Sequence, residues 1–245
     1  MGDGTKRDQE HERGRSVADR PPLAGEPLPL DLVNTTFIKG GVRGFLVDAL
    51  TTPEELDLWL DEHRPRFSPT LAGALAVAGP DGRARQGHLD RFLELRRALR
   101  ELAAARVEDR APGPADCEVV NAAVRSAAPR RELAPGPSFA VATRWPEADP
   151  LLVALGEVAA GAVDLLTGER AGLLRACPAP GCILYFVKGH ARREWCTVGC
   201  GNRVRVARHS RRAGSAVGAG CADSAAGTGA AAPAPPAAAG AERLT

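Results

Sequence analysis

The sequence of 245 residues has few aromatic residues, only five histidines and no long uninterrupted apolar run. A membrane-spanning helix needs roughly 20 consecutive apolar residues, and no stretch approaches that length, so we expect no membrane partner. The segment from Met1 to Arg20 is too charged for a secretory signal, which favours a cytoplasmic protein. Only His63 and His88 lie in the N-terminal part expected to fold, and no nucleophile or phosphate-loop motif accompanies them. We therefore expect that the protein is not an enzyme.

Charge is distributed unevenly along the chain, although the net charge is only +2. Residues 171–212 contain nine cations and one acid, a net charge of +8, which leaves −6 for the remainder. This pattern predicts an acidic body joined to a basic module that seeks phosphates. Arginine outnumbers lysine 29 to 3, and Ala, Gly and Pro are abundant, so we attribute the preference for arginine to a GC-rich, bacterial genome and not to a ligand.

Both ends of the chain are expected to be disordered. Residues 1–27 are charged and contain Pro and Gly without apolar periodicity, and residues 213–245 are mostly Ala, Gly and Pro. Neither segment can bury a core. The chain between them is expected to form a helical N-terminal domain over residues 28–170 and a small C-terminal module over residues 171–212.

Helices dominate the predicted N-terminal domain. One begins at Thr52, where a capping box with Glu55 precedes an apolar face. Others are predicted by apolar periodicity and end signals over residues 87–107, 115–127 and 150–167. Residues 139–143 are predicted to form a short strand, whereas residues 71–77 fit a helix or a strand.

The segment from Leu28 to Thr36 is apolar around Asp31, Asn34 and Thr35. Two interpretations remain open. In one, the segment is a core element whose polar side chains cap neighbouring backbone, as short Asx side chains often do. In the other, these three polar residues line a pocket for a small-molecule effector.

Four of the six cysteines lie within 24 residues, in the pattern C-x4-C-x13-C-x3-C formed by Cys177, Cys182, Cys196 and Cys200. Two close pairs on either side of a hairpin-sized segment can place four thiolates around one zinc ion. Two disulfides or an iron-sulfur cluster would need an oxidising compartment or redox partners, for which nothing else in the sequence argues. Because four thiolates close the coordination sphere, the zinc would be structural.

Residues 183–187 and 192–195, between the cysteine pairs, are predicted to form a β-hairpin. A helix follows from Cys200 to Arg212 and supplies the last ligand in its first turn. A mainly α protein with a treble-clef-like, four-cysteine zinc finger at its C-terminal end is the expected fold class. His190 and His209 could act as alternative ligands, but four cysteines already satisfy zinc.

A helical wheel places most polar side chains of the predicted C-terminal helix on one face. At 100° per residue they share an arc of about 120°, and they are Asn202, Arg205, Arg208, His209 and Arg212. Such side chains read base edges or bind phosphates. Arg211 is expected to add a phosphate contact, and Arg192 and Arg193 to extend the surface. Arg203 falls beside the apolar face, where a guanidinium would stabilise zinc thiolates, so we expect it to be structural.

The motif W-C-x3-C-G-N-R at Trp195 to Arg203, followed by a basic helix, resembles the CGNR zinc-finger family of bacterial proteins. Upstream, LDLVNTT at residues 30–36, LRRALREL at 95–102, the segment from Asn121 and LLTGER at 165–170 resemble the ABATE domain that accompanies this finger. The sequence departs from the family at Lys188, His190 and Glu194. The resemblance implies a stress-induced transcription regulator in which a helical sensing domain precedes a DNA-binding finger, and Trp195 is expected to support that finger.

We therefore expect a zinc-dependent regulator that binds duplex DNA. The alternative is a zinc-stapled protein-interaction module whose basic helix binds an acidic partner. Because one small finger binds DNA weakly, we also expect a homodimer. Cys117 and Cys221 lie outside the constellation and are given no metal role.

Overall fold

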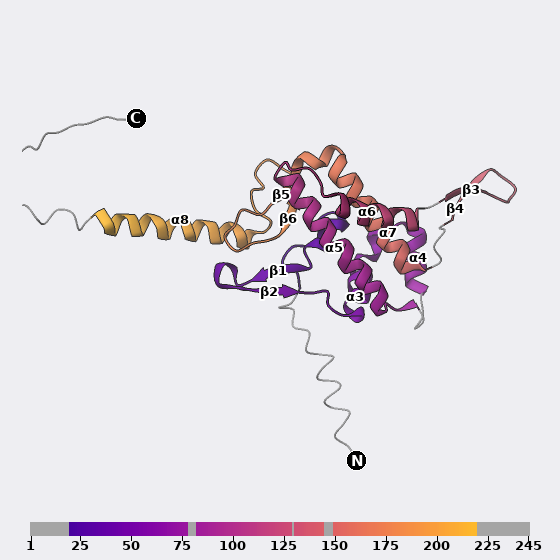
Figure 1. The fold of residues 1–245 in the computed structure, drawn as a ribbon, viewed down its shortest axis with the longest axis horizontal. Helices are drawn as coiled ribbons and strands as arrows, with labels where there is room; N and C mark the ends of the chain where they lie inside the picture. The colour runs from indigo at the N-terminus through magenta and orange to yellow at the C-terminus, as the bar shows by residue number, and fades with distance from the viewer. Residues whose placement is uncertain (1–19, 78–81, 129, 145–148, 220–245) are drawn as a thin grey trace, which may run out of the picture. The chain divides into compact units, whose positions relative to one another are not determined.

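A computed structural model describes residues 20–77, 82–128, 130–144 and 149–219 (Figure 1). For Arg131, Thr143 and residues 210–219, only the backbone is described. The chain divides into two compact units, of which the first ends at Val204 and the second begins at Arg205. The helices of the N-terminal region and all four clustered cysteines therefore belong to one unit.

The core of the first unit is built by three helices that pack on one another: α5 (Gln86–Val107), α6 (Pro114–Ala127) and α7 (Pro150–Thr167). The three predicted helices are thus confirmed. The apolar stripe of α5 is buried because residues spaced three and four apart share one face, and it consists of Leu89, Phe92, Leu95, Leu99 and Leu102. Helices α6 and α7 approach closely at Gly156, where a Cβ would lie only 2.2 Å from that of Ala127.

Helix α3 (Pro53–His63) begins with the predicted capping box. The Glu55 amide donates to Thr52 Oγ1 at 3.3 Å, and the Thr52 amide donates to Glu55 Oε2 at 3.1 Å. These bonds satisfy donors that the first turn of a helix leaves unpaired. Residues 71–77, ambiguous in the sequence, lie in helix α4 (Pro69–Val77).

Helix α7 alone, among the described residues, has the length and apolar content of a membrane-spanning segment. Half of its 18-residue window is buried inside the protein. Its inward face includes Ala154, Val158 and Ala159, none of which is exposed. An apolar helix buried in this way is a core helix of the bundle.

Six strands in the described chain form three separate antiparallel pairs: β1 (Thr36–Lys39) with β2 (Phe45–Asp48), β3 (Arg130–Ala134) with β4 (Ala140–Arg144), and β5 (Leu174–Ala176) with β6 (Tyr185–Val187). Strand β4 covers most of the predicted strand at residues 139–143. The β3–β4 hairpin exposes Leu133, Phe139 and Val141.

The predicted hairpin is corrected in one strand. Strand β6 lies inside residues 183–187 as expected, but residues 192–195 form no strand. The partner of β6 is β5, which ends just before Cys177. The first cysteine pair therefore lies in the hairpin connection. Helix α8 (Val198–Ala219) follows, so the expected class, mainly α with a C-terminal hairpin and helix, is confirmed.

The N-terminal segment is more ordered than the sequence predicted. Leu23 and Glu26, inside the segment expected to be disordered, are 9% and 5% exposed. They precede the short helix α2 (Leu28–Val33). A single apolar residue and a single carboxylate carry no periodic signal, so only their distant partners reveal that this segment is folded.

Candidate metal centre

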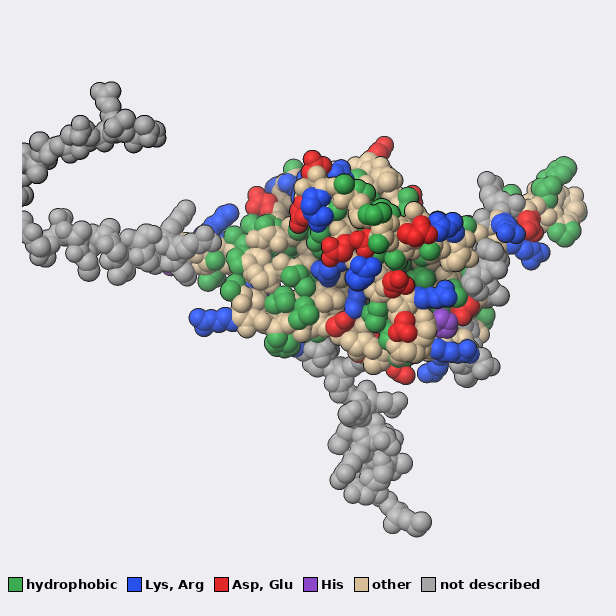
Figure 2. Space-filling model, in the orientation of Figure 1, with side chains coloured by type: hydrophobic (Ala, Val, Ile, Leu, Met, Phe, Trp, Pro, Cys, Tyr) green, Lys and Arg blue, Asp and Glu red, His purple; other side chains and the backbone are tan. Residues whose placement is uncertain are grey.

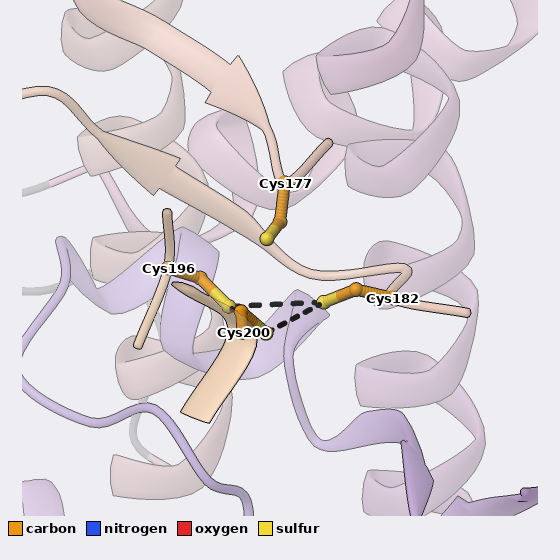
Figure 3. Close-up of side chains that lie close together, drawn as sticks. All are labelled: Cys177, Cys182, Cys196 and Cys200. Atoms are coloured by element: carbon orange, nitrogen blue, oxygen red, sulfur yellow. Dashed lines mark hydrogen bonds between the residues drawn. The ribbon is translucent and has the colours of Figure 1, made fainter. Parts of the chain in front are cut away.

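The four cysteine side chains converge from the two ends of the C-terminal module (Figure 3). Cys177 follows β5 and Cys182 precedes β6, while Cys196 comes just before α8 and Cys200 lies in its first turn. Cys177, Cys196 and Cys200 are buried, and Cys182 is half-buried. The described residues thus hold four sulfurs in one largely solvent-shielded cluster.

The backbone fixes each pair of cysteines locally. The Cys177 amide donates to the Leu184 carbonyl at 2.9 Å and the Cys182 amide to the Ala179 carbonyl at 3.0 Å, which closes the turn. Gly181 has a φ of +68°, and a Cβ there would lie 2.6 Å from the Gly41 carbonyl carbon. Only glycine fits this close approach between the turn and the N-terminal hairpin loop.

The sulfur positions fit one zinc ion. All four Sγ atoms lie within 4.8 Å of one another, with separations of 3.7 Å for Cys182–Cys196, 3.3 Å for Cys196–Cys200 and 3.8 Å for Cys182–Cys200. A tetrahedron with Zn–S bonds of about 2.3 Å requires sulfurs roughly 3.8 Å apart. These cysteines are free thiols and not disulfides.

The charge of the four clustered sulfurs also favours a bound cation. Hydrogen bonds from Cys182 and Cys196 lower the pKa of the Cys177 thiol to about 2, and the bond to Cys177 raises the pKa of Cys182 to about 12. One thiolate is therefore stabilised by its neighbours' protons, and the raised pKa values of Cys182 and Cys196 oppose a second thiolate there. Four adjacent thiolates need a metal ion. The four cysteines form a single zinc site, which is structural because no coordination position is left open.

In the Cys-Gly-Asn-Arg segment at residues 200–203, the structure explains the residue type at three of the four positions. Cys200 is a ligand. A Cβ on Gly201 would lie 2.9 Å from Cδ1 of Trp195. The absence of a side chain at Gly201 therefore leaves room for the half-buried indole to pack against α8. Arg203 donates from its Nη2 to the Cys200 sulfur at 3.0 Å. Asn202 is the exposed member of the four.

Arg203 also joins the metal centre to the N-terminal region. Its side chain lies against Gly41, where a Cβ would lie 2.8 Å from Arg203 Cδ, and Gly41 has a φ of +73°. The Arg203 Nε is buried without a hydrogen-bond partner. A guanidinium tolerates this position because the anionic sulfur stabilises its charge.

Arg193, expected on the DNA-binding surface, is instead half-buried and bonded to other parts of the protein. Its Nη2 donates to Glu26 Oε1 at 2.6 Å and to the Cys196 carbonyl at 3.2 Å, and its Nη1 donates to the Val187 carbonyl at 3.1 Å. The guanidinium also lies 4.7 Å from the centre of the Phe186 ring. We therefore remove Arg193 from the candidate DNA contacts and assign it to the attachment of the N-terminal segment.

The polar residues of the segment preceding β1 bind other parts of the protein. Asn34 is fully buried: its Nδ2 donates to the Tyr185 carbonyl at 2.8 Å, and the Tyr185 amide donates to Asn34 Oδ1 at 3.0 Å. Asp31 accepts from Arg66 and from the Glu26 amide. Thr35 donates to the Leu32 carbonyl and accepts from Arg96. This geometry matches the capping interpretation of the segment more closely than a pocket.

Replacing Asn34 with alanine should lower the free energy of unfolding by about 3 kcal/mol, because the amide and the carbonyl of the half-buried Tyr185 both lose their fully buried partner. Chemical denaturation of the zinc-loaded protein measures this. Asn121→Ala, an exposed position on α6, is the control and should change stability by less than about 0.5 kcal/mol. Equal, small effects of the two variants would contradict the capping role.

The structure describes the exposure of some, but not all, of the other residues expected to contact DNA. Arg192, Asn202, Arg205 and Arg208 are exposed. The side chains of Arg211 and Arg212 lie outside the described residues, as does Cys221. His190 and His209 are exposed and do not belong to the sulfur cluster.

Arg100 joins three segments of the protein, a structural role that the sequence did not reveal. It donates to the carbonyls of Ile183 at 2.9 Å, Val33 at 2.6 Å and Thr36 at 3.1 Å. Burial lowers the pKa of its guanidinium, which lies 5.9 Å from the centre of the Tyr185 ring. Arg100 lies outside the apolar stripe of α5, and the pattern of one helix does not show that another segment covers its polar face.

Comparison with known families agrees with this geometry. Residues 26–169 match the ABATE family, described as "Putative stress-induced transcription regulator", and residues 174–213 match the CGNR zinc finger. A comparison with curated proteins gave no match. The ABATE match spans more than half of the chain. The chain therefore belongs to the ABATE family and carries a CGNR zinc finger over residues 174–213.

Proposed function

We propose that this protein is a cytoplasmic transcription regulator that binds duplex DNA through helix α8 of its zinc finger. The observation that carries the proposal is the exposure of Asn202, Arg205 and Arg208 on a helix whose first turn supplies the zinc ligand Cys200. Zinc fixes the start of the helix, and its polar side chains are exposed where phosphates and base edges can reach them.

Charge supports the same assignment. Residues 171–212 carry a net charge of +8, whereas the rest of the chain carries −6. On the face of the helical body seen in Figure 2, cations and acids alternate. Some surface cations of the body are also paired with acids, as in Arg97–Asp116 and Arg125–Glu118. A surface of mixed sign gives little attraction for a polyanion, so the basic module is the better candidate.

Converting Arg205, Arg208 and Arg212 together to alanine should weaken binding to all DNA sequences. Each lost phosphate contact removes a released counterion, so the slope of log K against log salt should become shallower by up to about 3. Fluorescence-anisotropy titrations of the zinc-loaded full chain at several salt concentrations measure this.

The control is Arg91, Arg125 and Arg170 changed to alanine, which removes the same charge from exposed positions on the helical body. It should leave the slope unchanged. An equal loss of slope in both triple variants would show that net charge alone drives binding. No binding at low salt by zinc-loaded wild-type protein would end the DNA proposal and favour an acidic protein partner.

A further inference from the structure

A cavity of about 350 Å³ lies where the C-terminal halves of α5 and α7 meet the start of α6. Its apolar wall includes Leu102, Val120 and Leu166, and the thiol-bearing Cys117 lines it from α6. Ligand sites in helical bundles commonly lie between helices, with volumes of roughly 300–1,000 Å³. This cavity is therefore large enough for a small organic ligand.

The polar lining of the cavity is cationic. Arg106 at the end of α5 and Arg110 in the following loop both line it, with the Asn121 amide beside them. Both arginines form exposed ion pairs. Arg106 lies 4.0 Å from the fully exposed Asp109, and in the Arg110–Glu108 pair both side chains are about half-exposed. Exposed ion pairs contribute little, so a ligand anion can take these guanidinium groups without breaking a strong interaction.

The lining defines the chemistry of the occupant. Apolar walls favour an apolar body, and two arginines in the lining favour a planar anion that accepts paired hydrogen bonds, which is a carboxylate. At about 30 Å³ for each non-hydrogen atom, the volume admits roughly ten such atoms. An eight-carbon carboxylate has this size.

We propose that this cavity binds an amphipathic organic carboxylate and is the effector site of the protein. Asp31, Asn34 and Thr35, the residues first considered for such a site, bind other parts of the protein instead. None of them lines this cavity. The binding step does not depend on the DNA proposal; only the regulatory consequence rests on it.

Leu166 connects the cavity to the zinc finger through apolar packing. It lines the cavity and also packs against a second apolar cluster. That cluster contains Leu174 of β5 and Val187 of β6, the two strands that hold the first cysteine pair. A ligand that changes the packing of Leu166 therefore acts on this cluster, which includes residues of both hairpin strands.

Binding is tested on the zinc-loaded full chain with octanoate, octan-1-ol and octylamine, by calorimetric titration and by thermal unfolding. Octanoate at 100 times its Kd should raise Tm by roughly 8 °C, and the alcohol and the amine should bind at least about tenfold more weakly, since they lack the anion. Octanoate that does not bind, or that binds no better than the alcohol, would overturn the proposal.

Two variants locate the binding. Cys117→Phe fills the cavity and should abolish octanoate binding. Arg106→Gln with Arg110→Gln keeps the cavity open and should erase only the preference for the acid over the alcohol. Arg91→Gln, on α5 outside this cavity, is the control. Octanoate binding that survives both the filled cavity and the paired Arg→Gln change would place the ligand elsewhere. DNA affinity with and without octanoate is measured separately, so loss of DNA binding and loss of ligand binding are distinguished.

Discussion

Replacing Cys196 with serine should release the zinc and unfold the C-terminal module. Structural zinc contributes on the order of 10 kcal/mol to the folding of small fingers. Cys196 contacts two other sulfurs, at 3.7 Å and 3.3 Å. The three remaining cysteines cannot close the tetrahedron. Zinc content by mass spectrometry under native conditions should fall from one ion per chain to none.

The unfolding should extend beyond the finger, but not to all of the first compact unit, which ends at Val204. The apolar cluster around the sulfurs also contains Leu23 and Phe37 from the N-terminal region, so amide hydrogen exchange should accelerate in β1 as well as in β6. The packed helices α5, α6 and α7 have their own core and should retain their protection. Cys117→Ser is the matched control and should keep its zinc. A Cys196→Ser protein with full zinc content and unchanged exchange would contradict the assignment of the ligands.

Local patterns explain what the sequence could predict. The cysteine spacing reveals the zinc site because both pairs lie within short turns, where separation along the chain fixes separation in space. The capping box at Thr52 and the stripe on α5 are local for the same reason. Each depends on residues at most a few helical turns apart.

Contacts between distant segments explain what the sequence could not predict. Strand β6 has two possible neighbours along the chain, and the choice of β5 over residues 192–195 depends on packing against α5 and α2. Glu26 and Arg193 are separated by 167 residues. Nothing in either local sequence distinguishes a buried ion pair from two solvated charges.

Arg192 and Arg193 are adjacent arginines that the sequence treats alike and the structure separates. Arg193 is 24% exposed and pairs with Glu26, which is 5% exposed and also accepts from the Val187 amide at 2.9 Å. Arg193→Ala leaves this buried carboxylate without its cation and should cost about 3 kcal/mol. Arg192 is exposed, and Arg192→Ala should change stability by less than about 0.5 kcal/mol.

The two variants should therefore give opposite patterns in two measurements. Arg193→Ala should lower Tm by roughly 10 °C while the folded protein keeps its salt-dependent DNA affinity. Arg192→Ala should keep its Tm and lose one unit or less of the salt slope. A double-mutant cycle with Glu26→Gln isolates the pair: in the Arg193→Ala background, Glu26→Gln should cost much less than it does alone, because the cation is already absent. If Arg193→Ala leaves Tm unchanged and weakens DNA binding as Arg192→Ala does, its guanidinium faces the nucleic acid. The attachment of the N-terminal segment to the finger would then have to rest on Asn34 and Arg100.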